Sequence, residues 1–274
     1  MFRTAATLFL TFTFSLLSLQ ASAADQKMDR LFELSGLTDQ LTMMPEMIAS
    51  TVAQGEQRVP ADKVAKAEEI FRKAFASDRL KRQLHDEVDG AFTAAEVDRM
   101  LAWYSSPLAI KITASEKAAA MVDGVELQMA VAGLEDNQRL FEIAQEVEKL
   151  TGVTDMMMRF QEQAALSLYT SVAAIARPSA PLNYDQMQEA IRQQMGAARE
   201  QTYGYMIAVM VYSWKDIPLA DLEKYADFLR TPEAVRFMRL STKGILDGMN
   251  LAFSDGISEL MQLMKAEFEA GAEK

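Results

Sequence analysis

The sequence predicts an all-α protein built from two tandem, related helical units. Helix-favouring residues such as Ala, Leu, Met, Glu, Gln and Lys are abundant. The apolar–polar alternation typical of strands is absent from the sequence, and glycine and proline separate the helical segments. In addition, segment 92–112 recurs without a gap as 217–237, and the phrase Leu34-Ser-Gly-Leu-Thr-Asp39 recurs as Leu150-Thr-Gly-Val-Thr-Asp155. We expect the two units to form a bundle-like array about a pseudo-two-fold axis.

The N-terminus, residues 1–23, has the features of a secretory signal peptide. Arg3 supplies a positive charge, residues 5–19 form a short apolar stretch, and Ala21-Ser22-Ala23 is a small-residue cleavage site. The stretch is shorter than the ~20 residues of a membrane span, and no Cys follows that could carry a lipid. We therefore predict cleavage near Ala23 and a periplasmic location, with full secretion or an uncleaved anchor helix as alternatives.

The first helical unit is predicted at residues 24–135. Gly36 is expected to end its first helix, and Thr38 and Ser77 are expected to cap later ones. Pro45 is expected to bend the second helix. The helices expected before the recurrent segment cover about residues 26–35, 38–56, 60–76 and 77–89.

The recurrent segment predicts a helical corner. Thr93 and Glu96 have the spacing of a capping box. Ser106-Pro107 ends that helix and begins the next, which is expected to reach about Leu134. Thr231-Pro232 repeats the corner in the second unit. Both copies carry an apolar stripe at helical spacing, formed by Val97, Met100, Leu101 and Tyr104 and by Leu222, Tyr225, Ala226 and Leu229.

The second unit is predicted at residues 136–274, after a joint at 135–137. Segment 177–181 is expected to be a loop because it contains two prolines. Glycines at 244, 248 and 256 are expected to weaken the last helix. The helices expected in this unit, besides the corner, cover about residues 137–150, 155–176, 185–213 and 232–268.

Composition excludes several classes of function. The formal charge is −11, and removal of Arg3 with the signal peptide leaves 27 basic against 39 acidic residues, a charge of −12. Such a chain lacks the basic face that binds nucleic acid or anionic lipid headgroups. After the signal peptide the most apolar run, residues 206–212, is too short to span a membrane. The chain has no Cys, so no disulfide contributes to its stability.

Three features together resemble a known family. They are the signal peptide, the turn phrase at 34–39, and the Ser/Thr-Pro corner with a basic residue four positions after the proline. This combination is similar to the domain of unknown function 2059 family, small helical domains of exported bacterial proteins, and the pattern occurs twice here. The second copy departs from it through Pro218 and a longer middle. The resemblance implies a helical fold and a periplasmic address; it implies no activity and no catalytic residue.

Candidate catalytic residues are few. His85 is the one histidine in the chain, and it lies beside the apolar stripe of a predicted helix, without partners that the sequence identifies. Glu223 and Asp227 are four residues apart on a helix, and paired carboxylates are the groups that glycosidases use. Their counterparts in the first copy are Asp98 and Ala102, so the pair is not duplicated. No nucleotide, metalloprotease or hydrolase motif is present, and we expect no cofactor and no catalytic site.

Methionine is the unusual component, with 19 residues. One cluster follows each turn phrase, and thioethers are soft ligands suited to Cu(I). The alternative is that flexible methionines fill irregular space in a helical core. Consecutive positions point ~100° apart on a helix, so only part of each cluster can converge. The candidate metal ligands are Met43, Met44, Met47, Met156, Met157 and Met158.

Two further pairs are duplicated and are candidate contact residues. Trp103 and its counterpart Phe228 flank the apolar stripe of the corner helix and are either core residues or an exposed contact surface. Lys111 and its counterpart Arg236 follow each corner proline and either anchor an anionic group or form ordinary surface ion pairs.

The expected function is that of a non-enzymatic periplasmic binding or protein-interaction module. Its partner would be another periplasmic protein or an apolar ligand. The alternatives are a Cu(I) protein that uses methionine ligands, a carrier of hydrophobic ligands, and a hydrolase of unrecognised type.

Overall fold

A computed structural model describes residues 25–55, 61–119, 122, 124–134, 137–176 and 184–272. Every regular element within these residues is a helix, and no strand occurs among them, which confirms the all-α prediction. The predicted signal peptide and the predicted loop at 177–181 lie outside the described residues.

The first helices match the sequence prediction closely in extent. A helix over residues 25–34 is followed by Gly36, whose φ of 81° is the left-handed conformation that favours glycine. Helices α2 (Leu37–Gly55), α3 (Ala61–Ala74) and α4 (Ser77–Val88) follow. The two predicted caps were wrong: Thr38 lies inside the first turn of α2, because the helix begins directly after Gly36, and α4 is preceded by Ala76 without a side-chain cap.

The corner of the first half is formed by α5 (Ala94–Tyr104) and α6 (Pro107–Ala119). The predicted capping box between Thr93 and Glu96 is present. The Ser106 hydroxyl accepts a hydrogen bond from the Ala109 amide at 3.2 Å, as expected for a cap before proline. The prediction of one helix from 107 to 134 was wrong, because a separate helix α7 (Gly124–Ala132) follows. The sequence places an Asp-Gly pair, a common turn signal, at this break.

The second half begins at the predicted joint, where the Asn137 side chain caps α8 (Gln138–Thr151). Gly152, with φ of 64°, repeats the turn of Gly36 and leads into α9 (Val153–Ala176). Helix α10 (Tyr184–Trp214) then reaches the second corner, formed by α11 (Leu219–Leu229) and α12 (Pro232–Ala272). Thr231 caps α12 as Ser106 caps α6, through a hydrogen bond from the Ala234 amide at 3.4 Å.

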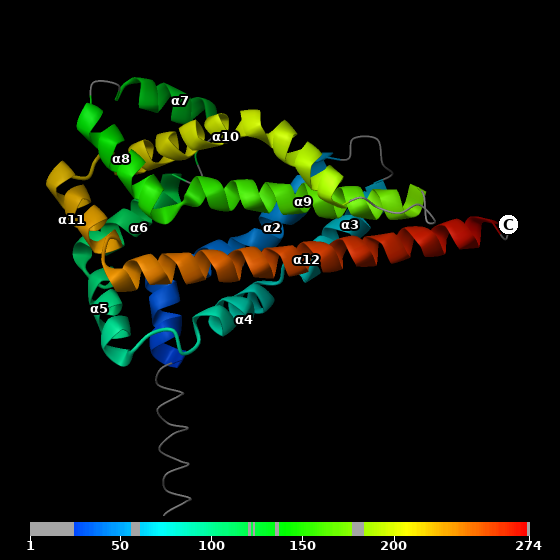
Figure 1. Ribbon diagram of the computed structural model, residues 1–274, viewed down its shortest axis with the longest axis horizontal. Helices are drawn as coiled ribbons and strands as arrows, with labels where there is room; N and C mark the ends of the chain where they lie inside the picture. Colours follow the sequence, from blue (N-terminus) through cyan, green and yellow to red (C-terminus); the bar gives the residue numbers. More distant parts are fainter. Residues whose placement is uncertain are drawn as a thin grey trace, which may run out of the picture.

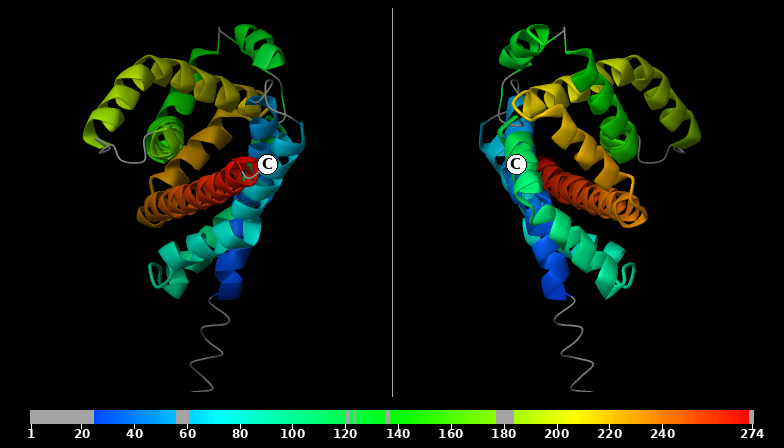
Figure 2. Two further views of the ribbon diagram at one scale, coloured as in Figure 1. Left: turned by 90° about the vertical axis from the view of Figure 1, so that its right-hand side faces the viewer. Right: turned by 90° about the vertical axis from the view of Figure 1, so that its left-hand side faces the viewer.

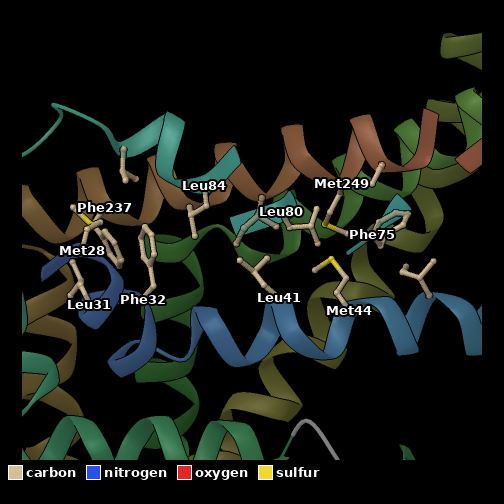
Figure 3. Packing of buried hydrophobic residues seen from close by; sticks show 14 of the residues in the cluster. Met28, Leu31, Phe32, Leu41, Met44, Phe75, Leu80, Leu84, Phe237 and Met249 are labelled. Carbon is tan, nitrogen blue, oxygen red and sulfur yellow. The ribbon is translucent and has the colours of Figure 1, made fainter. Parts of the chain in front are cut away.

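The two hydrophobic cores cross the boundary between the sequence halves. The first core is built from residues 28–104 but also takes in the inner face of α12, including Phe237 and Met249. In the close view, these two side chains reach the same layer as Phe32, Leu80 and Leu84 of the first half (Figure 3). The second core is built from α8, α10 and α11 but includes Ile112 of α6. Each half therefore contributes its post-corner helix to the core of the other half.

Helix α12 is the long central element of the molecule. It packs against α4 on one side and α9 on another (Figure 1). Viewed from either end, the blue-to-cyan helices of the first half and the yellow helix α10 lie on different sides of α12 (Figure 2). Both corner helices, α5 and α11, lie at the end of the molecule opposite the C-terminus (Figure 1).

The glycines of α12 are close-approach points within a continuous helix. A Cβ atom at Gly244 would lie 3.1 Å from the Cα atom of Leu84, and one at Gly248 would lie 3.2 Å from a methyl group of Leu80. Residues without a side chain at these positions let α4 approach α12 closely. The prediction that these glycines weaken the helix missed this role, because it considered only intrinsic helix propensity.

The two corners contact each other reciprocally. The Arg236 guanidinium donates a hydrogen bond to the Ala91 carbonyl at 3.1 Å, and the Lys111 ammonium donates to the Asp216 carbonyl at 3.0 Å. Lys111 and Arg236 occupy matched positions in the two copies, and so do Ala91 and Asp216 in the same ungapped register. The two corners therefore exchange contacts between matched sequence positions, while the pseudo-two-fold packing of the whole units stays a prediction.

Loss of these contacts is expected to destabilise the protein unequally. Arg236 is half-buried and also pairs with Glu96 at 2.5 Å, whereas Lys111 is exposed. We expect Arg236→Met to lower the free energy of unfolding by about 1–2 kcal/mol and Lys111→Met to lower it by about 0.5 kcal/mol or less. Urea denaturation of the two variants tests this. If the two variants lost the same free energy of unfolding, the difference in burial between Arg236 and Lys111 would be contradicted.

Candidate functional site

A cavity of about 290 Å³ lies between the two halves. The turn phrases and the post-corner helices α6 and α12 line it with residues from both copies of the repeat. Such interfaces between related units are common places for ligand sites. The matched pairs that line the cavity are Ser35 and Thr151, Leu37 and Val153, Gln40 and Met156, Ile112 and Phe237, Thr113 and Met238, and Glu116 and Ser241.

Aromatic rings form a large part of the cavity wall. The ring of Trp214 meets that of Tyr225 edge to face, with centroids 5.9 Å apart and planes at 89°. Trp103 lies parallel to Tyr225, at 6.3 Å between centroids, and Tyr104 meets Phe237 at 6.4 Å. All five residues line the cavity. The wall is thus largely apolar and aromatic, with Trp103 and Tyr225 partly exposed and Trp214, Tyr104 and Phe237 buried.

Glu116 is the charged side chain among the described residues that line the cavity. Its carboxylate accepts a hydrogen bond from the Trp214 indole N–H at 3.2 Å, and the Tyr225 hydroxyl also hydrogen-bonds to it. Burial raises the pKa of Glu116 to about 7, although both hydrogen bonds act to lower it. The side chain retains some accessible surface, which we attribute to the cavity it lines. Near neutral pH this carboxyl is therefore poised between its charged and neutral forms.

Burial keeps the neighbouring phenols neutral. It raises the pKa of Tyr104 and of Tyr225 well above the usual tyrosine value, and the charge of Glu116 adds to both shifts. Glu116 is accordingly the cavity group whose charge changes in the ordinary pH range.

Two polar atoms of cavity-lining residues are buried without a partner in the described part of the chain. These atoms are the indole nitrogen of Trp103 and the hydroxyl oxygen of Ser241. Buried polar groups in folded proteins are normally hydrogen-bonded, so these two atoms are exceptions at the cavity wall.

The predicted contact pair Trp103 and Phe228 lies at the junction of the two corners. Their rings stack on each other with centroids 4.7 Å apart and planes at 10°. Each ring therefore has the other as a packing partner, and Trp103 also borders the cavity. The second contact pair, Lys111 and Arg236, makes the reciprocal carbonyl contacts described above.

The predicted methionine ligands are dispersed. Met44 is a core residue, whereas Met43 and Met47 are exposed. Of the second cluster, Met156 lines the central cavity, while Met157 and Met158 line two other depressions. Three different methionines, Met206, Met210 and Met238, join Met156 around the cavity. No group of three or more His, Cys, Asp or Glu suited to a metal occurs among the described residues.

The candidate catalytic residues lie away from this cavity. His85 Nε2 is 3.0 Å from the Asp29 carboxylate, and its ring packs edge-on against Phe32. Glu223 pairs with Arg139, and Asp227 pairs with Arg230, all on the exposed surface. The two carboxylates are thus engaged by different arginines.

Sequence reasoning did not identify Glu116, although a signal was present. Ala109, Ile112 and Ala119 are the buried face of α6, and Glu116 falls on this face by helical spacing. An ionisable residue on an apolar face is a recognisable sign of a functional or structural network. The matched residue Ser241 is polar and buried as well.

Comparison with known proteins gives one match. Residues 78–133 match a family described as "Uncharacterized protein conserved in bacteria (DUF2059)". This stretch runs from α4 to α7 and includes the first corner and Glu116. It confirms the family resemblance for one copy; the second copy lies outside the match and stays a prediction. No curated protein and no solved structure matches the chain. Within the described residues, no helix combines the length and apolar character needed to cross a membrane.

Proposed function

We propose that this protein is a non-enzymatic binding protein of the periplasm that encloses a small, largely apolar molecule in the cavity between its halves. The observation that carries the proposal is a cavity lined by both copies of the repeat. Its volume of about 290 Å³ is close to the lower end of the range for small-molecule sites. The periplasmic address rests on the predicted signal peptide.

The chemistry of the wall supports binding of an amphipathic molecule. Aromatic and aliphatic side chains supply most of the lining, and flexible methionines allow the wall to adapt to shape. Polar side chains also line the cavity, among them Glu116, Gln40 and Thr113, and they can fix the orientation of a bound molecule. Apolar walls with a small number of fixed polar groups are typical of ligand pockets.

Binding is favoured over catalysis by where the reactive groups lie. His85 lines a separate depression with Asp29. None of the described residues lining that depression is Ser, Thr or Cys, the usual nucleophiles of hydrolases.

A Cu(I) site is the second candidate. It is favoured by the presence of Met156, Met206, Met210 and Met238 around one cavity, since thioethers are suited to Cu(I). Titration of the protein with Cu(I) against a competing chelator separates the two candidates. Tight uptake of one Cu(I) that excludes organic probes would favour copper over the apolar ligand.

Filling the cavity is expected to abolish binding of an organic probe. Both tryptophans of the chain, Trp103 and Trp214, line the cavity, so their fluorescence reports directly on an occupant. We expect cyclohexylmethanol to cause a saturable fluorescence change in the wild type. Ser241→Leu places a larger apolar side chain at the cavity wall and is expected to remove that change without lowering the melting temperature.

Ser254→Leu is the matched control, because Ser254 is exposed on the same helix. It should leave the fluorescence titration unchanged. The proposal fails if Ser241→Leu binds the probe as the wild type does, or if the wild type binds none of cyclohexylmethanol, choline and 3,3-dimethylbutan-1-ol.

A further inference from the structure

We infer that the ligand of this cavity is a small organic cation, whose ammonium group lies between the Glu116 carboxylate and the aromatic rings. The inference rests on the proposed function and names the chemical class of its ligand.

Charge is the first argument. Glu116 is a carboxylate without a cationic partner at the cavity: the residues that α9, α10 and α12 contribute to the lining are uncharged. Lys117 of the same helix is engaged by Asp39 at 2.7 Å, and Lys111 by the Asp216 carbonyl. A buried carboxylate is costly unless an opposite charge compensates it, and a bound cation would supply that charge.

The rings are the second argument. Trp214 and Tyr225 stand at 89° to each other, and both donate hydrogen bonds to Glu116. The carboxylate is therefore set in an aromatic corner, with Trp103 and Tyr104 further along the wall. Aromatic faces attract ammonium groups, and walls of several rings are typical of sites for methylated ammonium.

The same wall disfavours a hydrated metal ion. Hard cations such as Mg²⁺ and Ca²⁺ require several oxygen ligands. The cavity offers one carboxylate, and the described residues contain no cluster of acidic side chains or histidines suited to a metal. An alkylated ammonium needs no such ligand shell, because its charge is spread over carbon groups that contact the rings directly.

Proton release is a consequence of this mode of binding. With a pKa of about 7 for Glu116, a cation must displace the proton of the neutral form. The neighbouring phenols of Tyr104 and Tyr225 stay neutral because burial raises their pKa. The apparent affinity for a cation is therefore expected to increase by about 30-fold from pH 5.5 to pH 8.

Choline and 3,3-dimethylbutan-1-ol test the inference. They share shape and hydroxyl group and differ in the positive charge. We expect the tryptophan fluorescence of the wild type to report tighter binding of choline, by at least about 10-fold at pH 8. Glu116→Gln should weaken the binding of choline by about 100-fold or more. It should leave the affinity for the neutral alcohol nearly unchanged.

Glu223→Gln is the matched control, because it removes an exposed carboxylate on α11. It should leave choline binding unchanged. If choline and its neutral isostere bound equally well, or if the isostere bound more tightly, the inference that the ligand is a cation would be wrong. The proposed function, binding of a small molecule in this cavity, would still stand. Choline binding that is insensitive to Glu116→Gln would likewise contradict the inference of a cationic ligand.

Discussion

Glu116→Gln is expected to stabilise the protein, by about 1 kcal/mol at pH 5 and by up to about 3 kcal/mol at pH 8. The reason is that the folded state holds Glu116 with a pKa of about 7, above the 4.5 of an ordinary glutamate. Ionisation is thus harder in the folded than in the unfolded chain. The wild type loses stability as pH increases from about 4.5 to about 7, and the neutral amide does not.

Urea denaturation between pH 5 and pH 8 measures this difference. Both proteins contain Trp103 and Trp214, so unfolding is followed by the same signal. Glu223→Gln serves as the control and should differ from the wild type by a small amount that varies little with pH, because Glu223 is exposed. A gap between wild type and Glu116→Gln that stays constant with pH would refute the assignment of a raised pKa.

The second large effect is expected at the contact of α4 with α12. Gly244→Ala should lower the free energy of unfolding by about 1–3 kcal/mol. The new methyl group would lie 3.1 Å from the Cα atom of Leu84 and 3.2 Å from the Cβ atom of Glu87. Backbone atoms of a packed helix cannot move aside as a flexible side chain can, so the two helices would have to separate.

Gly196→Ala is the same substitution at another glycine, and it is expected to stabilise the protein instead. Gly196 is exposed in α10 and has no atom within 4 Å of the added methyl group. Alanine should therefore stabilise the protein by about 0.5–1 kcal/mol through helix propensity alone. Thermal or urea denaturation of the two variants and the wild type measures both changes in stability. If Gly244→Ala stabilised the protein as Gly196→Ala does, the close approach of α4 to α12 would be contradicted.

Both copies of the recurrent sequence contribute residues to the cavity. Matched positions of the two copies line the cavity, and at one of these pairs the residues are Glu116 and Ser241. One copy supplies an ionisable group and the other a hydroxyl at the matched position. We propose that this asymmetry gives the ligand one orientation.

Much of the fold was predictable from local sequence. The capping box at Thr93, the left-handed glycines at 36 and 152, and the Ser-Pro and Thr-Pro corners all appear as expected. These features depend on atoms within one helical turn of each other, so local residue order determines them. The cap predicted at Ser77 is absent, and the break before Gly124 was not predicted.

The candidate site was predictable only in fragments. Trp103 was identified as a candidate contact residue and Met156 as a candidate ligand, and both line the cavity. Glu116 was missed, because the partners that surround it come from two helices, α10 and α11, that are distant from α6 in sequence. Burial of a single carboxylate depends on inter-helix geometry, which periodicity along one helix does not encode.

The helical class, the extent of most helices and the recurrence of the corner follow from the residues along the chain. The packing of each post-corner helix into the core of the other half, and the meeting of matched residues around one cavity, became apparent only from the folded molecule. The two kinds of feature differ in how far apart in sequence the interacting residues are. Caps, turns and stripes are set by neighbours within a few residues, whereas helix pairing, cavity shape and the protonation of Glu116 depend on atoms brought together by folding.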